Sequence, residues 1–146
     1  MVNIGKGIIA GFVASAALSG AVVLAAWTGL TLAFHPVEAV SGIMLTPAGL
    51  SWVVHFAIGT LLWGPLFAAL SPILPGPFWL KGVVFGVIAW LLMAAVIWAA
   101  DPTSPPQIIP GRVLLNLLFG VLLGSIYRTL LDRTERRSPT LQTGKW

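Results

Sequence analysis

The sequence predicts an all-α integral membrane protein: one domain, residues 1–146, whose four membrane-spanning helices form a bundle. Hydrophobic residues make up 58% of the chain and charged residues 8%, and the mean hydropathy is +0.96. The apolar residues fall into four runs separated by polar or proline-rich segments. Each run approaches or exceeds the roughly 20 residues that a helix needs to cross the hydrocarbon of a bilayer.

The first predicted span covers residues 7–34, which is longer than the hydrocarbon requires, so we expect it to tilt or protrude. Residues 35–49 contain apolar residues at helical spacing, which predicts a short interfacial helix. The second span covers residues 50–70 and is preceded by Thr46 and Pro47, typical of an N-cap and a first-turn proline. Pro65 lies inside this span and cannot donate a backbone hydrogen bond, so we expect a bend there.

A proline-punctuated turn at residues 71–77 predicts a tight connection to the third span, residues 79–100. Residues 101–112 form a polar loop with four prolines, too many for a helix. The fourth span covers residues 113–131 and leads into a basic tail, residues 132–146, which we expect to fray at its end.

The lysine and arginine residues predict the orientation. Seven of the eight fall on one side of the predicted spans, and Arg112 alone falls on the other. The positive-inside rule therefore predicts cytoplasmic N and C termini, and we expect the bacterial cytoplasmic (inner) membrane. Topology accounts for the net charge of +4, so we predict no nucleic-acid partner.

An internal repeat relates the two halves of the chain. The segment that begins Lys6-Gly7 and ends at Gly11 matches the segment from Lys81-Gly82 to Gly86, and His55 with Gly59 matches Asn116 with Gly120. The repeat predicts two similar helical hairpins in one orientation. Common packing demands are the alternative explanation for the similarity.

The predicted spans lack the groups that membrane enzymes and ion-coupled transporters use. Their apolar cores contain no Asp, Glu, Lys or Arg, and the chain has no cysteine. Proton relays and ion-coupled transport keep ionisable groups at membrane depth, and hydrolysis needs a nucleophile beside an acid and a base. We predict no enzymatic activity, no catalytic residue and no metal site.

Two histidines are the candidate cofactor ligands, His35 after the first span and His55 inside the second. Both belong to the same leaflet, so bis-imidazole haem ligation is conceivable, as is pigment ligation by His55 alone. The simpler interpretation is a histidine that is hydrogen-bonded to a neighbouring helix or to interfacial water.

Small and polar residues form stripes at helical spacing, which predicts close helix contacts, either inside the bundle or with another polypeptide. The candidate contact residues are Gly7, Gly11, Ser15, Ser19, Gly59, Gly82, Gly86, Asn116, Gly120 and Gly124. Trp63 and Trp90 lie deep in their spans, where an indole either fills the core or faces a bound lipid, quinone or pigment.

The chain resembles an uncharacterised family of short four-span bacterial membrane proteins that contain a domain of unknown function. The similarity includes the segments from Lys6 to Gly11, from Trp52 to Gly59, from Lys81 to Trp90 and from Gly120 to Tyr127. The resemblance implies the four-span fold and brings no activity with it.

These observations lead to a principal hypothesis and two alternatives. We expect a non-enzymatic accessory or structural subunit that packs against other membrane proteins in the bilayer, with energy-transducing complexes, photosynthetic or respiratory, among its candidate partners. The first alternative is a small protein that binds haem, pigment or quinone through His55. The second alternative is a protomer of a small transporter or channel.

Overall fold

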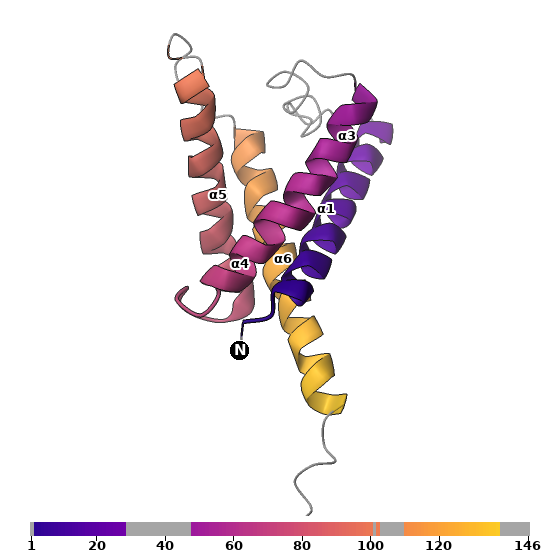
Figure 1. Cartoon of the computed structure of the whole chain (residues 1–146). Coiled ribbons are helices and arrows are strands. Elements are labelled where there is room, and N and C mark those ends of the chain that lie inside the picture. Colours follow the sequence, from indigo (N-terminus) through magenta and orange to yellow (C-terminus); the bar gives the residue numbers. More distant parts are fainter. Residues whose placement is uncertain (1, 29–47, 101, 103–109, 138–146) are drawn as a thin grey trace, which may run out of the picture.

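The computed structural model describes residues 2–28, 48–100, 102 and 110–137. Its helical segments are, in order, α1 (Ile4–Trp27), α3 (Ala48–Ala57), η1 (Ile58–Trp63), α4 (Gly64–Leu70), α5 (Phe78–Ala100) and α6 (Pro110–Arg137). The segments α3, η1 and α4 follow one another without a break and form one continuous helical rod (Figure 1). Because it contains the second predicted span, we call it the second rod. Among these described residues, four helices are long and apolar enough to cross a membrane. The protein is therefore an all-α membrane protein built as a four-helix bundle.

Helix α1 differs from its predicted span at both ends. It begins at Ile4 and ends at Trp27, a length of 24 residues, or about 36 Å, which suits a hydrocarbon layer of roughly 30 Å with a modest tilt. Thr28 already lies in a turn, so the predicted continuation to residue 34 is wrong at that point. The apolar run in the sequence continues to Phe34, whereas α1 ends at Trp27. Residues 29–47, including the predicted interfacial helix and N-cap, lie outside the described residues.

The second rod contains a π-helical segment beside Pro65, where the sequence predicts a bend. The backbone N–H of Gly64 donates to the carbonyl oxygen of Gly59, five residues earlier. Pro65 occupies the first turn of α4, a position at which a proline is well tolerated. The wider turn before it relieves the clash between the proline ring and the preceding turn that an α-helix would impose.

Helices α5 and α6 contain the third and fourth predicted spans. Helix α5 begins at Phe78, one residue before the prediction, and ends at Ala100 as predicted. Helix α6 begins at Pro110, where proline suits a first turn, and continues to Arg137. Helix α6 therefore extends beyond the predicted span, residues 113–131, at both ends, although its apolar part begins at Val113 as predicted. The first residues of the predicted tail are helical, and an ion pair between Arg128 and Asp132, one turn apart, stabilises them.

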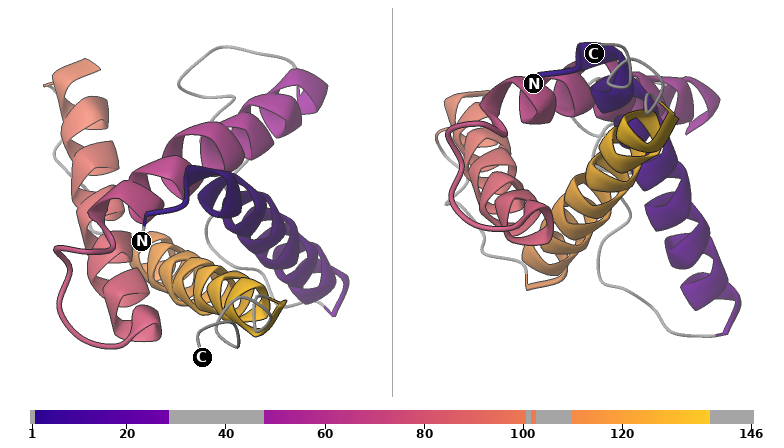
Figure 2. Two further views of the ribbon diagram at one scale, coloured as in Figure 1. Left: turned by 60° about the horizontal axis from the view of Figure 1, so that its bottom comes forward. Right: turned by 90° about the horizontal axis from the view of Figure 1, so that it is seen from below.

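The helices pair as two consecutive antiparallel hairpins. Helix α1 packs against the second rod, and α5 packs against α6. Helix α6 lies between α5 and α1 and joins the two hairpins (Figure 2). The structure thus has the two helical hairpins that the sequence predicts.

In the first hairpin, α1 and the second rod cross each other where four glycines meet. Gly7 and Gly11, one turn apart on α1, pack against the backbone of Gly64 and Gly59, and a Cβ at Gly7 would lie 2.6 Å from the Gly64 carbonyl oxygen. Gly59 and Gly64 are five residues apart, which would separate them by about 140° on an α-helix. The five-residue turn of η1 instead brings both onto one face. The π-helical segment thus completes the face against which α1 packs.

The second hairpin also crosses at glycines. Gly82 and Gly120 face each other so closely that a Cβ on either would run into the carbonyl group of the other. Gly86 packs against the Asn116 carbonyl oxygen, which would lie 2.5 Å from a Cβ, and Gly124 packs against the carbonyl oxygen of Phe78. Close backbone approach of this kind is the main source of helix association in lipid.

The two crossings differ in register, although their sequences repeat. Gly59 and Gly120 occupy matching positions in the two halves, and so do Gly7 and Gly82. Gly120 faces Gly82, whereas Gly59 faces Gly11, one turn further along α1. The repeated glycines therefore serve the same packing purpose in both hairpins, with a shift of one turn.

The largest buried side chains lie toward the end of the bundle at which α1 begins. Phe67 is fully buried, and its ring contacts those of Phe85 and Tyr127 edge-on, with centroid distances of 5.3 and 5.7 Å. At the other end of α5, Val96 and Trp98 are 62% and 55% exposed. The described helices are thus tied together by an aromatic core at the end at which α1 begins, whereas the last turns of α5 leave large apolar side chains exposed.

Candidate functional site

A polar pair joins α1 and α3 within the first two apolar spans. Ser19, which is buried on α1, places its Oγ atom 3.3 Å from the Nε2 atom of His55 on α3. The serine hydroxyl donates when Nε2 carries no proton and accepts when it does. This contact agrees with the simpler interpretation of His55 from the sequence, which is a histidine hydrogen-bonded to a neighbouring helix.

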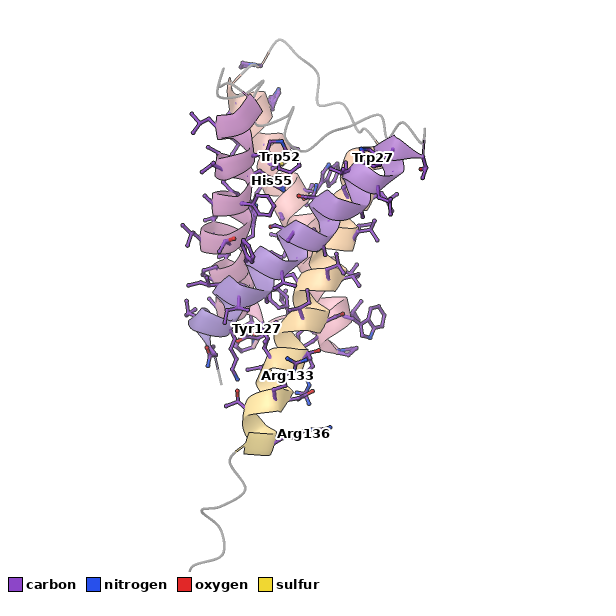
Figure 3. All side chains as sticks on the ribbon, turned by 90° about the vertical axis from the view of Figure 1, so that its right-hand side faces the viewer. Trp27, Trp52, His55, Tyr127, Arg133 and Arg136 are labelled. Atoms are coloured by element: carbon purple, nitrogen blue, oxygen red, sulfur yellow. The ribbon has the colours of Figure 1, made fainter. Side chains whose placement is uncertain are left out.

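Aromatic side chains surround the polar pair. The His55 ring meets those of Trp52 and Phe56 nearly at right angles, with centroid distances of 6.3 and 5.5 Å. Trp52 and Phe56 stack on each other at 6.1 Å, and Phe56 also meets Phe12 of α1 at 5.9 Å. Figure 3 shows Trp27, Trp52 and His55 toward one end of the molecule and Tyr127 toward the other. The cluster gives α3 a rigid apolar wall beside the histidine.

A groove of about 620 Å³ lies between α1 and α3, next to this pair. It is open on one side and almost wholly apolar. Its lining comes from two elements: Ala16, Ser19, Gly20, Val23, Leu24 and Trp27 of α1, and Trp52 and Phe56 of α3. Ser19 therefore connects the groove to the histidine, because it both lines the groove and contacts His55.

The floor of the groove differs from the glycine crossings in one respect. A Cβ at Gly20 would meet nothing within 4 Å, whereas one at Gly11 would strike the backbone of the second rod. Ala16 lies one turn before Gly20 and is also exposed. Helix α1 thus has two faces of small residues, one packed inside the hairpin and one open toward the groove.

The predicted contact stripes lie mostly inside the chain. Gly7, Gly11 and Ser15 face the second rod, and the stripes of α5 and α6 face each other. In the described structure these glycines are therefore covered by the chain's own helices, the first of the two alternatives that the stripes predict. His35 falls outside the described residues, so no second histidine is placed beside His55.

Two hydroxyl groups beside the π-helical segment are buried without a hydrogen-bond partner in the described structure, Ser15 Oγ and Thr60 Oγ1. Ser15 points at Gly59, where a Cβ would collide with its hydroxyl. Trp63, one of the two deep tryptophans, packs against Phe85 at a centroid distance of 6.0 Å. Trp63 is partly buried and packs against the core. Of the two interpretations of its depth, core packing is therefore the one that this contact favours.

Three residues of the site have no distinctive signal in the sequence: Gly20, Gly64 and Trp27. Gly64 is hidden because its spacing from Gly59 fits no α-helical stripe, and only the neighbouring Pro65 indicates an irregular turn. Gly20 lies four residues after Ala16, a small-residue spacing that the pattern of Gly7, Gly11, Ser15 and Ser19 overshadows. Among the described residues, no three His, Cys, Asp or Glu side chains gather as metal ligands.

Comparison with known families gives one match. The model described as Family of unknown function (DUF6789) matches residues 1–138. No curated protein and no solved structure matches the chain. Because the family model covers most of the sequence, the chain belongs to this family of unknown function.

Proposed function

We propose that this DUF6789 protein is a non-enzymatic accessory subunit that receives a membrane-spanning helix of another polypeptide in the groove between α1 and α3. We place it in the bacterial cytoplasmic membrane with both termini in the cytoplasm, on the basis of its lysine and arginine distribution. The proposal keeps the role expected from the sequence and moves the contact surface from the glycine stripes to the groove.

The observation that carries the proposal is the open surface at Gly20. Association of helices in lipid depends on close van der Waals packing, which small residues permit. The glycines at the two crossings already pack against an opposing backbone of the same chain, so they are not open to another helix. Gly20 and Ala16 offer the same property to a helix from outside, because no atom of the described structure lies within 4 Å of a Cβ at Gly20.

Two tryptophans flank this surface and favour a protein occupant. Trp27 is 86% exposed and Trp52 is 37% exposed, and both line the groove. Large aromatic side chains beside a smooth depression provide the anchors that dominate many protein interfaces. A helix seated on Ala16 and Gly20 buries both rings, so one binding event covers the small residues and the aromatic side chains together.

A leucine scan of three glycines tests the proposal through the partner that co-purifies in mild detergent. Gly20→Leu is expected to fold like the parent and to lose its partner, because its side chain fills only the groove. Gly111→Leu is the matched control, since a Cβ there also meets nothing within 4 Å but lies away from the groove. It is expected to keep the partner, whereas Gly11→Leu is expected to lose the fold. Retention of the same partner by Gly20→Leu rejects the groove as the contact.

A second function is favoured by the Ser19–His55 pair. The groove has a volume within the roughly 300–1,000 Å³ of small-molecule sites, and its polar edge suits an apolar molecule with one hydrogen-bonding group, such as a quinone, a pigment or haem. On this alternative the purified protein carries such a molecule in a one-to-one ratio, and His55→Phe loses it while keeping the fold. Solvent extraction followed by mass spectrometry and an absorbance spectrum separates this function from the first.

A further inference from the structure

Helix α6 continues beyond the end of the bundle at which α1 begins. The buried Tyr127 marks this level, because its hydroxyl oxygen accepts a hydrogen bond of 3.0 Å from the backbone N–H of Asn3. The helix then runs from Arg128 to Arg137, which adds about 15 Å at 1.5 Å per residue. Figures 1 and 3 show this end of α6 projecting past the other helices.

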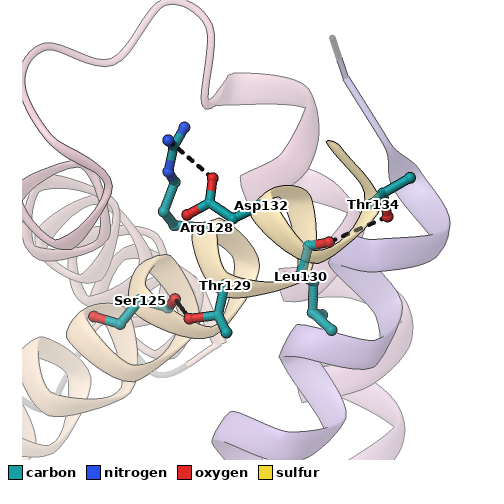
Figure 4. Close-up of polar contacts among 6 residues, drawn as sticks. All are labelled: Ser125, Arg128, Thr129, Leu130, Asp132 and Thr134. Carbon is teal, nitrogen blue, oxygen red and sulfur yellow. Dashed lines mark hydrogen bonds and ion pairs between the residues drawn. The ribbon is translucent and has the colours of Figure 1, made fainter. Parts of the chain in front are cut away.

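The projecting end carries a net positive charge, part of which is already used. Residues 128–137 contain four arginines, one aspartate and one glutamate, which gives 4 − 2 = +2. Arg128 forms an ion pair of 2.9 Å with Asp132 (Figure 4) and also lies over the ring of Phe78, 5.6 Å from its centroid. The charge of Arg128 is therefore directed back toward the protein.

Arg133 and Arg136 differ from Arg128 in their surroundings. Both are exposed, and among the described residues neither has an ion-pair partner. They are three positions apart, so their side chains leave the same side of the helix. The nearby Lys81 does not add to this face, because its Nζ atom donates to the Ser71 carbonyl oxygen at 2.6 Å. Within the part of the chain that the structure describes, the projecting end thus displays two guanidinium groups that have no ion-pair partner and leave the same side of the helix.

The depth of these two arginines matches that of lipid phosphate groups. The apolar run of the fourth span ends at Tyr127, and Arg128 is the first charged residue after it. The boundary of the hydrocarbon therefore lies near this level, because charged side chains avoid the hydrocarbon. The headgroup layer beyond it is roughly 5–8 Å thick on each side. Arg133 and Arg136 lie about 9 and 14 Å beyond Tyr127 along an untilted helix. Helix tilt and the length of the arginine side chain bring both guanidinium groups within reach of that layer.

We propose that the face of α6 formed by Arg133 and Arg136 binds the phosphate groups of anionic phospholipids in the adjoining leaflet. A guanidinium group suits this partner, because its planar donors can engage a phosphate with two hydrogen bonds. Each arginine near an anionic membrane surface contributes about 1 kcal/mol, or about five-fold in affinity, and the effect weakens as salt screens the charges.

Native mass spectrometry of the full chain in detergent, titrated with phosphatidylglycerol or phosphatidylcholine, tests this site. Arg133→Gln with Arg136→Gln is expected to weaken phosphatidylglycerol binding by about 25-fold, which is five-fold for each arginine, and to leave phosphatidylcholine binding unchanged. The matched control, Lys6→Gln with Lys145→Gln, removes the same charge elsewhere and is expected to change binding by less than about two-fold, because neither lysine belongs to the proposed site.

Two results overturn the proposal. If the arginine double variant binds phosphatidylglycerol like the parent, the face does not contact lipid phosphate. If the lysine double variant loses as much affinity as the arginine variant, net charge alone governs the binding and no site exists. A parent protein that prefers phosphatidylglycerol, with the loss confined to the arginine variant, supports the site.

Discussion

Ser19 Oγ lies 3.3 Å from His55 Nε2, and this contact joins α1 to α3 beside the open groove. The contact sets the spacing of the two groove walls, because Ser19 is itself part of the lining. A polar pair at this depth has little water to compete with it, yet such pairs contribute only about 0.6 kcal/mol on average in membrane helices. Its main effect is therefore on the shape of the groove rather than on the stability of the bundle.

Ser19→Ala is accordingly expected to lower the free energy of unfolding by about 0.6 kcal/mol and by no more than about 1.7 kcal/mol. Titration with a denaturing detergent, followed by circular dichroism, measures this loss. Ser125→Ala, at an exposed position on α6, is the control and should be nearly neutral. A loss above 3 kcal/mol, taken as roughly twice the expected ceiling, would show that the pair holds the hairpin together.

Gly120→Ala should destabilise the protein far more than Gly20→Ala. The added Cβ at Gly120 runs into the Gly82 carbonyl group, so α5 and α6 must separate, at a cost of about 1–3 kcal/mol. The same substitution at Gly20 meets nothing within 4 Å and should stay within about 0.5 kcal/mol of the parent. Thermal unfolding of both variants in one detergent makes the comparison, and equal losses would contradict the crossing described for the second hairpin.

Gly59 and Ser15 are expected to be energetically coupled. Gly59→Ala places a methyl group against the hydroxyl of Ser15, and Ser15→Ala removes that hydroxyl, which has no hydrogen-bond partner in the described structure. The single Gly59 variant should be clearly destabilised, and the double variant should recover about 0.5–3 kcal/mol of that loss. A double-mutant cycle measures the coupling directly. Strictly additive effects would mean that α1 does not meet the π-helical segment at this point.

Tyr127→Phe isolates the hydrogen bond to Asn3 from the packing of the ring. Removing the hydroxyl should cost about 0.5–1.5 kcal/mol, because the ring contacts with Phe67 and Phe78 remain. Tyr127→Ala also removes the ring and should cost about 3–5 kcal/mol, as for other large core side chains. If both substitutions have the same effect, the hydroxyl rather than the ring ties α6 to the start of α1.

The four spans could be predicted from the sequence because apolar runs of this length have few other solutions in a bilayer. The helix ends were less predictable. Thr28 leaves the helix although the apolar run continues, and α6 gains its last residues partly from the Arg128–Asp132 pair. Hydropathy reports solvent preference and not backbone geometry, so it locates the start of the fourth apolar span at Val113 but not the two ends of α6.

The candidate site was less accessible to sequence reasoning than the fold. His55 is conspicuous in the sequence because it is a polar residue inside an apolar span. Its partner Ser19 cannot be distinguished there from the other small residues of the stripe on the first span. The π-helical segment changes which residues face α1, so the pairing of Gly64 with Gly7 follows from no α-helical period. The open face at Gly20 is visible only once the neighbouring helices are in place.

Photo-crosslinking in intact membranes tests the central claim, that the groove at Gly20 receives a helix of another polypeptide. A photoreactive amino acid replaces Leu24, which lines the groove and is 64% exposed, in one variant and Leu61, which is 66% exposed on the second rod, in a control variant. Gly20 itself stays unchanged, so the groove remains open. The account predicts a discrete covalent product with a second membrane protein from position 24 and none from position 61. Crosslinks to lipid alone from position 24, or the same products from both positions, contradict it.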